Sequence, residues 1–225
     1  MLHICKAKFP NESNLSLGIT KAMLLDNTEA ESRLIKSKAY PDMKIDVAVN
    51  RSLIDFYNTY PSAYTNNDKM TYFRVYADTP MNEDVKKQIY PALRSCLQGL
   101  SEHQAVSRLL NFVQTGFEYE YDETIWGCDR AFFAEETLYY PYCDCEDRSI
   151  LLSRLIRDLL GLDCVLIYYP GHLACAVNFT QKEKGDYYMY NQKEYTVCDP
   201  TYINAPIGVQ MPNFKDKEAT VVPIK

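Results

Sequence analysis

Two cysteines, Cys143 and Cys145, lie two residues apart in the stretch YPYCDCEDRSILLSRLIRDLLG. A thiol at such a place can be a disulfide partner, a metal ligand or a nucleophile. Cys145 stands at the start of a predicted helix, where unpaired backbone N–H groups and the helix dipole favour a thiolate. The adjacent Glu146 and Asp147 are negative and oppose it. A nucleophilic Cys145 would therefore need a positively charged partner.

Three histidines are candidates for that partner. His3 lies at the start of the chain, and His103 lies in the first turn of a polar-faced predicted helix, where a surface role is the simpler interpretation. His172 begins a predicted strand directly after a Pro-Gly turn. A histidine that acts as a base needs a group that orients its ring, and Asp199, at the end of the strand EYTVCD, is the candidate. These residues predict a triad of Cys145, His172 and Asp199.

The helix that carries Cys145 should pack centrally, because its apolar residues form a wide face. Asp144 is expected to cap this helix and Gly161 to end it. Two pairs of strand-like segments follow, each joined by a short turn, as in a β-hairpin. The segments are residues 164–169 with 172–179, and residues 186–191 with 194–199. Helices first and antiparallel strands later predict an α+β fold.

Two further helices are predicted upstream of this helix. The first has Asn82 as its cap and Pro91 in its interior, which should bend or split it. The second begins with a capping box of Ser101 and Gln104 and ends at a glycine. Residues 117–140 are aromatic and are predicted to be mostly loop.

The N-terminal part of the chain is harder to interpret. Residues 1–78 are predicted to be a β-leaning region of unknown role, and residues 79–225 to be the core that carries the chemistry. Alternation of apolar and polar residues predicts strands at 44–50 and 70–77. A short helix is expected around 27–37.

Composition argues against several classes of protein. Of 225 residues, 47% are apolar and 24% are charged, which is typical of a chain with a real core. The formal net charge is -6 with no basic patch, so we expect no nucleic-acid partner. There is no run of 18 apolar residues, so no membrane segment is expected. The start MLHICKAKFPNES does not resemble a signal peptide, and a chain complete as printed would be expected in the cytoplasm.

The eight cysteines are expected to be reduced, because the chain is larger than disulfide-stapled scaffolds and the spacings form no compact framework. Cys164, Cys175 and Cys198 lie in apolar strand-like runs, where a thiol behaves as a small hydrophobe. A zinc site is the alternative, but it would lack a C-x2-C pair. Its candidate ligands are Cys128, Cys143, Cys145, Cys198 and His172. We expect no metal and no cofactor.

Three segments, CDCEDRSILLSRLIRDLLGL, GHLACAVNF and VCDPTY, together resemble the bacterial branch of the transglutaminase-like superfamily of papain-like fold. The resemblance covers about residues 101–205, and Cys145, His172 and Asp199 fall on the family's three catalytic positions. It implies a central helix, carrying the cysteine, packed on an antiparallel sheet. It also implies a thiol enzyme that forms a thioester with a peptide or protein substrate bearing an amide or glutamine group. Cys143 is not a family requirement, and with Tyr142 it stands where many relatives have glycine.

The resemblance favours hydrolysis of a peptide or amide, as by a cysteine peptidase or amidase. Transfer of the acyl group to an amine, as by a protein-glutamine transamidase, is one alternative. A catalytically inactive interaction module that keeps these residues is another. In relatives a second oxyanion donor comes from upstream of the cysteine, and Trp126 and Gln114 are the candidates for it here, beside the backbone N–H of Cys145.

Overall fold

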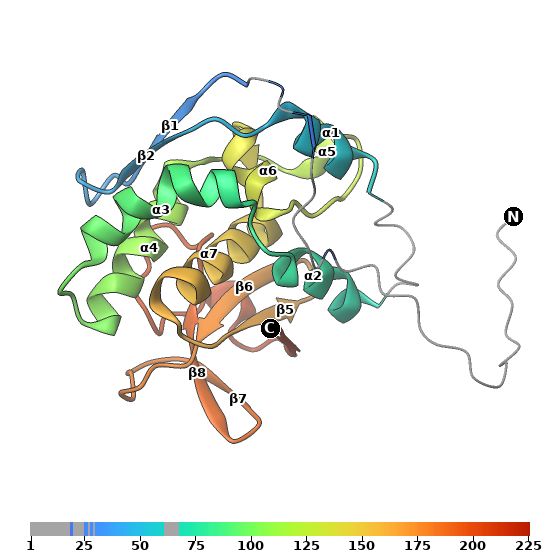
Figure 1. Ribbon diagram of the computed structural model, residues 1–225. Helices are drawn as coiled ribbons and strands as arrows, with labels where there is room; N and C mark the ends of the chain where they lie inside the picture. The colour runs from blue at the N-terminus through green and yellow to red at the C-terminus, as the bar shows by residue number, and fades with distance from the viewer. Residues whose placement is uncertain (1–18, 20–24, 27, 29, 61–67) are drawn as a thin grey trace, which may run out of the picture.

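The structure is a computed structural model that describes residues 19, 25, 26, 28, 30–60 and 68–225. It has an α+β fold, in which the long helix α7 lies against a five-stranded antiparallel sheet (Figure 1). In the described residues the helices are α1 (Arg51–Asn58), α2 (Lys69–Asp78), α3 (Glu83–Leu97), α4 (Glu102–Gly116), α5 (Asp122–Ile125), α6 (Ala134–Tyr139) and α7 (Cys145–Leu160). The predicted fold class, with this helix on an antiparallel sheet, is confirmed. Its assignment as papain-like or transglutaminase-like stays a prediction.

The sheet has the strand order β7–β8–β6–β5–β9. The strands are β5 (Cys164–Tyr169), β6 (His172–Val177), β7 (Tyr187–Tyr190), β8 (Lys193–Cys198) and β9 (Thr220–Pro223). Both predicted hairpins are confirmed. The second turn lies at Asn191 and Gln192, one residue earlier than expected, and both take positive φ values of 46° and 64°. Such values suit a two-residue turn whose twist matches that of the strands.

The local sequence explains where α7 begins and ends. The Asp144 carboxylate accepts a hydrogen bond from the Glu146 backbone N–H (3.2 Å), and the Asp147 carboxylate accepts one from the Asp144 N–H (3.1 Å). Gly161 takes the left-handed conformation, with φ 68°, that ends many helices. The predicted cap and end are both confirmed.

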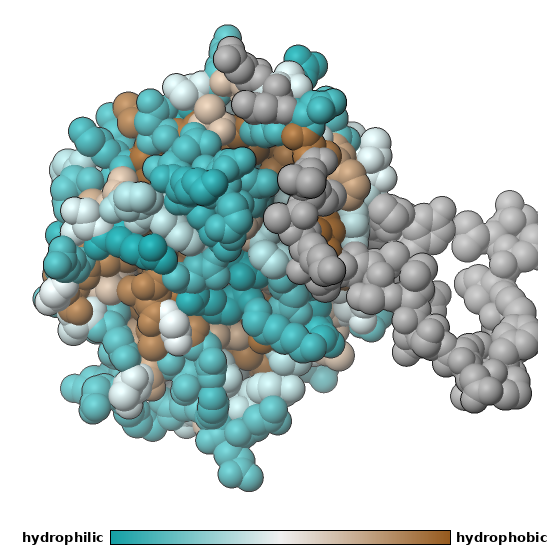
Figure 2. Space-filling model, in the orientation of Figure 1, coloured by the Kyte–Doolittle hydropathy of each residue, from teal (hydrophilic) through white to brown (hydrophobic). Residues whose placement is uncertain are grey.

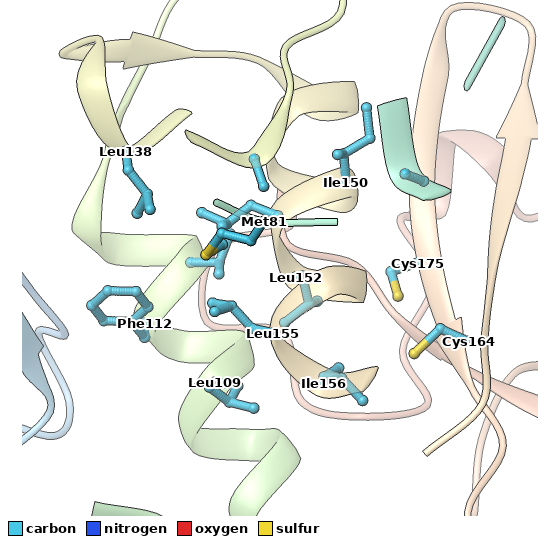
Figure 3. Close-up of a cluster of buried hydrophobic side chains, with 14 of the residues drawn as sticks. Met81, Leu109, Phe112, Leu138, Ile150, Leu152, Leu155, Ile156, Cys164 and Cys175 are labelled. Carbon is cyan, nitrogen blue, oxygen red and sulfur yellow. The ribbon is translucent and has the colours of Figure 1, made fainter. Parts of the chain in front are cut away.

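Helix α7 forms the centre of the core, and its side chains from Cys145 to Ile156 are all buried. It contacts β5 and β6 of the sheet as well as helices α2, α4 and α6. Figure 3 shows the apolar side chains gathered around it, including Leu109 and Phe112 of α4, and Cys164 and Cys175 of the sheet. A helix enclosed on so many sides gives a rigid base for the residue at its first turn.

The other two predicted helices are present. Asn82 accepts a hydrogen bond from the Asp84 N–H at the start of α3, which runs on through Pro91 without being split. Ser101 and Gln104 form the predicted capping box at the start of α4. The expectation that residues 117–140 are mostly loop is only partly right, because they contain the short elements α5, α6 and β3 (Glu118–Tyr119). Strand β3 pairs in parallel with β4 (Tyr142–Cys143).

Several expectations for residues 1–78 are wrong. Residues 70–77 form most of α2 instead of a strand, because Phe73, Tyr76 and Ala77 bury one helical face. Within the expected helix 27–37, the described residues include strand β1 (Arg33–Lys36), which pairs with β2 (Lys44–Val47), while residues 27 and 29 lie outside the described residues. The strand expected at 44–50 is present as β2 but is shorter, because it ends at Val47.

The described part of residues 1–78 is therefore not β-leaning, since it holds helices of eight and ten residues against two strands of four. Its buried residues Ile35, Ile45 and Leu53 join the same hydrophobic cluster as α7. The division between residues 1–78 and 79–225 stays a prediction. Figure 2 shows a largely hydrophilic face with smaller apolar areas among the polar ones. Among the described residues no helix has the length and apolar character to cross a bilayer.

Candidate functional site

Cys145 and His172 line the same cavity, which has a volume of about 340 Å³. The cavity lies at the first turn of α7 and beside the turn between β5 and β6. Side chains from α2, β3 and α5 complete its walls, among them Lys69, Tyr119 and Asp122. The structure therefore brings a thiol and an imidazole from distant parts of the chain to one concave surface.

Two contacts hold the start of β6 against the start of α7. Ser149, one turn after Cys145, donates a hydrogen bond from its hydroxyl to the Leu173 carbonyl (2.9 Å). The backbone N–H of Leu173 faces the Cys145 sulfur and favours its thiolate. Because Leu173 directly follows His172, these contacts place the start of β6, and with it His172, next to the first turn of α7.

The His172 ring is held by a buried carboxylate. His172 Nε2 lies 2.8 Å from Asp199 Oδ2, and both side chains are at most 5% exposed. The other carboxylate oxygen, Asp199 Oδ1, accepts hydrogen bonds from the backbone N–H groups of Thr201 (2.9 Å) and Tyr202 (3.2 Å). Phe214 stacks on the imidazole, with ring centroids 4.6 Å apart and planes 18° apart. The predicted pairing of His172 with Asp199 is thus present in the geometry.

The resting Cys145 thiol is engaged elsewhere. It donates a hydrogen bond to Glu146 Oε2 (3.0 Å), and in the described chain no hydrogen bond joins it to His172. Burial, followed by the negative charges of Glu146 and Asp144, raises the pKa of the Cys145 thiol well above its usual value. In the resting geometry the thiol is therefore paired with Glu146 rather than with His172, and its surroundings favour the protonated form.

Neither oxyanion candidate from the sequence lines the cavity. The Gln114 amide donates hydrogen bonds to the carbonyls of Asp199 (3.1 Å), Tyr202 (2.9 Å) and Ala205 (3.1 Å). Gln114 thus clamps the segment that follows β8. Trp126 packs its ring against Phe132 and Tyr140. Neither side chain is therefore placed to stabilise an oxyanion at Cys145.

Cys143 lies apart from the cavity. Its buried sulfur accepts a hydrogen bond from Arg148 Nε (3.4 Å). Burial raises the pKa of Cys143 to about 12, although the Arg148 charge opposes the shift. Arg148 is itself almost fully buried and also donates to the carbonyls of Gln114 (3.3 Å) and Phe117 (2.9 Å). Cys143 is therefore part of the support beneath the site.

A group of carboxylates surrounds the first turn of α7. Asp122, Asp129 and Glu146 each present an oxygen within 4.8 Å of the others, and so do Asp122, Asp144 and Asp147. Burial is the main cause that raises the pKa of Asp122 to about 6 and that of Asp144 to about 11. Oxygen-rich groups of this kind are ligands that hard cations prefer. The five residues considered for zinc do not form a common site in the described chain. Of these five, Cys145 belongs to a group of possible ligands, and its neighbours there are Asp144 and Glu146.

Several of these neighbours could not be found from the sequence. The sequence indicates that the charge of Glu146 opposes a thiolate, but not that Glu146 accepts the thiol's hydrogen bond. Phe214 and Asp122 come from segments far from α7, and no local pattern indicated that they would fold onto it. Tyr119 reaches the cavity through the two-residue pairing of β3 with β4, which is too short to read from periodicity.

Comparison with protein-family models gave no match to this chain. No curated protein matched it at a significant level either. Membership of the transglutaminase-like superfamily therefore stays a prediction.

Proposed function

We propose that this protein is a thiol-dependent acyl-transfer enzyme of transglutaminase-like kind that hydrolyses a peptide or amide bond through a thioester. The observation that carries the proposal is the shared cavity of Cys145 and His172, with the His172 ring held by buried Asp199. A nucleophile, a base and a group that orients the base are the parts that such chemistry needs.

The free nitrogen of His172 supports the roles proposed. Nε2 is occupied by Asp199, whereas Nδ1 makes no hydrogen bond within the described part of the chain. Nδ1 is therefore available to take the thiol proton once the Cys145 side chain turns from Glu146. The negative charge of Asp199 then stabilises the imidazolium.

The proposed reaction has two halves. The Cys145 thiol transfers its proton to His172, and the thiolate attacks the carbonyl carbon of the substrate. The carbon–nitrogen bond breaks as His172 returns the proton to the leaving amine, which leaves a thioester on Cys145. His172 then takes a proton from water, the hydroxide displaces the thiolate, and a carboxylic acid is released with the thiol restored.

The oxyanion formed in each half needs hydrogen-bond donors. The backbone N–H of Cys145 lies at the first turn of α7, where the N–H groups have no partner within the helix. We propose the Tyr119 hydroxyl as a second donor, because Tyr119 lines the same cavity as Cys145.

The test is acylation by p-nitrophenyl acetate, followed by release of p-nitrophenolate and by peptide mass spectrometry. Peptide-level detection is needed because Cys128 is exposed and will also react. We expect an acetyl thioester on Cys145 that turns over, and Cys145→Ala should abolish this turnover. The matched variant Cys143→Ala should retain it, since Cys143 lies outside the cavity.

Two outcomes would contradict the proposal. Turnover that survives Cys145→Ala and is lost in Cys143→Ala would move the nucleophile by two residues. Absence of the thioester on Cys145 in the wild-type protein, with a melting transition that shows the protein to be folded, would favour the non-catalytic interaction module. Adding a primary amine to the acylated enzyme separates the remaining alternative, because a transamidase would form the amide in place of the acid.

A further inference from the structure

The cavity beside Cys145 is strongly acidic. Its lining includes one lysine, Lys69, and five acidic side chains, which are Asp122, Glu123, Asp129, Asp144 and Glu146. Lys69 already pairs with the exposed Asp129 at 3.3 Å. Asp144 keeps its proton at neutral pH, because its pKa is raised to about 11, and the other carboxylates of the wall concentrate negative potential around the thiol.

The buried members of this wall form no ion pair with another described residue. In the described part of the chain, none of the ion pairs includes Asp122, Asp144 or Glu146. Glu146 is nine-tenths buried, and its carboxyl group contacts the Cys145 thiol and the Asp144 side chain. Buried carboxylates without a positive partner are unfavourable unless they are protonated or a cation binds beside them.

We propose that the cavity recognises an acyl substrate that carries a cationic ammonium or guanidinium group beside the scissile bond, with Glu146 and Asp122 as the recognising residues. This inference rests on the proposed function of Cys145 as an acyl-accepting nucleophile. A basic peptide side chain is the substrate group that fits, since it places one positive charge within reach of both carboxylates and leaves the acyl carbon for the thiol.

The hydrogen bond between the Cys145 thiol and Glu146 links recognition of the cation to activation of the thiol. In the resting geometry the thiol donates to Glu146 Oε2. A cation on that carboxylate competes with the thiol for the oxygen and offsets the negative charge beside the sulfur. Binding of the cationic group therefore releases the thiol toward His172, so recognition and activation of the nucleophile are coupled.

The experiment measures how the charge of a reagent affects its reaction with Cys145, which does not require catalysis. Three methanethiosulfonates of similar size are used, with a trimethylammonium, a neutral or a sulfonate end group. In each case the thiolate attacks the divalent sulfur that carries the end group. A mixed disulfide forms and methanesulfinate is released. Rates at Cys145 are followed by peptide mass spectrometry, since other thiols react as well.

We expect the cationic reagent to modify Cys145 about tenfold faster than the neutral one, and the anionic reagent to be slowest. The ratio should shrink severalfold in 1 M salt, because salt screens the cavity field. Glu146→Gln, which keeps the size of the side chain, should bring the ratio close to one. Asp129→Asn, at an exposed position, should lower it partly, and Glu83→Gln on α3, which is not part of the cavity lining, should leave it unchanged.

Peptide substrates complete the test. Paired fluorogenic amides with lysine or norleucine beside the scissile bond should differ severalfold in kcat/KM in the wild type and become equal in Glu146→Gln. Equal reagent rates in the wild type, or a ratio that Glu146→Gln leaves intact, would overturn the inference while an acyl-enzyme on Cys145 still upheld the proposed function. A strong cationic preference without any acyl-enzyme would support cation recognition and refute acyl transfer.

Discussion

Two histidine–carboxylate pairs of the same chemical kind lie in opposite surroundings. His172 Nε2 is 2.8 Å from Asp199 Oδ2, and His103 Nδ1 is 3.0 Å from Glu183 Oε2. The first pair is buried, whereas the His103 side chain is 52% exposed. The distances are nearly equal, so the contact itself does not distinguish a proposed catalytic pair from a surface one.

Burial and neighbours make the difference. Where water is excluded, a hydrogen bond to a carboxylate can hold an imidazole in one orientation, whereas at the surface water competes for both groups. Only the His172 pair has its carboxylate fixed by further backbone N–H groups and its ring beside a thiol-containing cavity. The expected surface role of His103 is confirmed.

The largest effect expected is loss of the buried imidazole. His172→Ala should reduce acylation and deacylation of Cys145 by about three orders of magnitude, because the base and the ion-pair partner are both removed. The matched change His103→Ala should alter the rates by less than about twofold, as surface substitutions usually do. The measurement is p-nitrophenolate release with both variants. Similar losses in the two would erase the proposed difference between the pairs.

A smaller change tests the carboxylates. Asp199→Asn should lower turnover by about two orders of magnitude or more, because the new amide donates to Nε2 and forces the ring proton onto Nδ1, the wrong tautomer for accepting the thiol proton. The remaining amide oxygen can still accept from Thr201 and Tyr202, so the melting temperature should change little. Glu183→Gln is the control and should keep full turnover. Retained activity in Asp199→Asn would show that orientation by Asp199 is not required.

Much of the framework follows from local sequence. Asp144 caps α7 and Gly161 ends it because a capping carboxylate and a left-handed glycine satisfy the helix ends with nearby atoms. The turn before His172 is likewise local. The strand predicted around Phe73 is wrong, since its aromatic and β-branched residues suit a strand and only burial against α7 shows that their spacing is helical.

The surroundings of the thiol could not be predicted in the same way. Asp122 begins α5 and Asp129 lies in the segment after that helix, and Phe214 comes from the segment before β9, so tertiary structure alone brings them to Cys145 and His172. The amide of Gln114 was expected near an oxyanion but satisfies three carbonyls around Asp199 instead. A buried amide finds whichever acceptors the fold leaves unpaired.

Burial separates two aspartate caps as it separates the histidine pairs. Asp68 caps α2 at the surface, and hydrogen bonds to Thr71 lower its pKa. Asp144 caps α7 in the interior, where burial and the nearby Asp147 raise its pKa to about 11. The native state therefore holds the Asp144 proton more tightly than the unfolded chain does. This contribution to stability is complete below the usual pKa of 3.8 and is lost as pH rises toward 11.

We therefore expect the wild type to lose about 1 kcal/mol of stability per pH unit between pH 6 and 8 from Asp144. Asp144→Asn keeps a capping oxygen and should flatten this slope, measured as melting temperature against pH. Asp68→Asn should leave the slope unchanged in this range, because the stabilisation from Asp68 is lost only as pH falls toward its lowered pKa. A slope unaltered by Asp144→Asn would mean that this carboxyl is ionised in the folded protein.

The smallest effect expected concerns the aromatic face on His172. Phe214→Leu keeps an apolar contact but removes the flat ring stacked at 4.6 Å, so we expect a loss of turnover of about threefold, with Asp199 still holding Nε2. Tyr187→Leu, on the exposed strand β7, is the control and should have no effect. The pH profile of acylation distinguishes a looser imidazole from a weakened fold, because only the former shifts the profile. A loss as large as that of Asp199→Asn would mean that stacking orients the His172 ring as strongly as the carboxylate does. The two histidine pairs would then differ mainly because His172 has aromatic rings stacked on it, whereas His103 has none among the described residues.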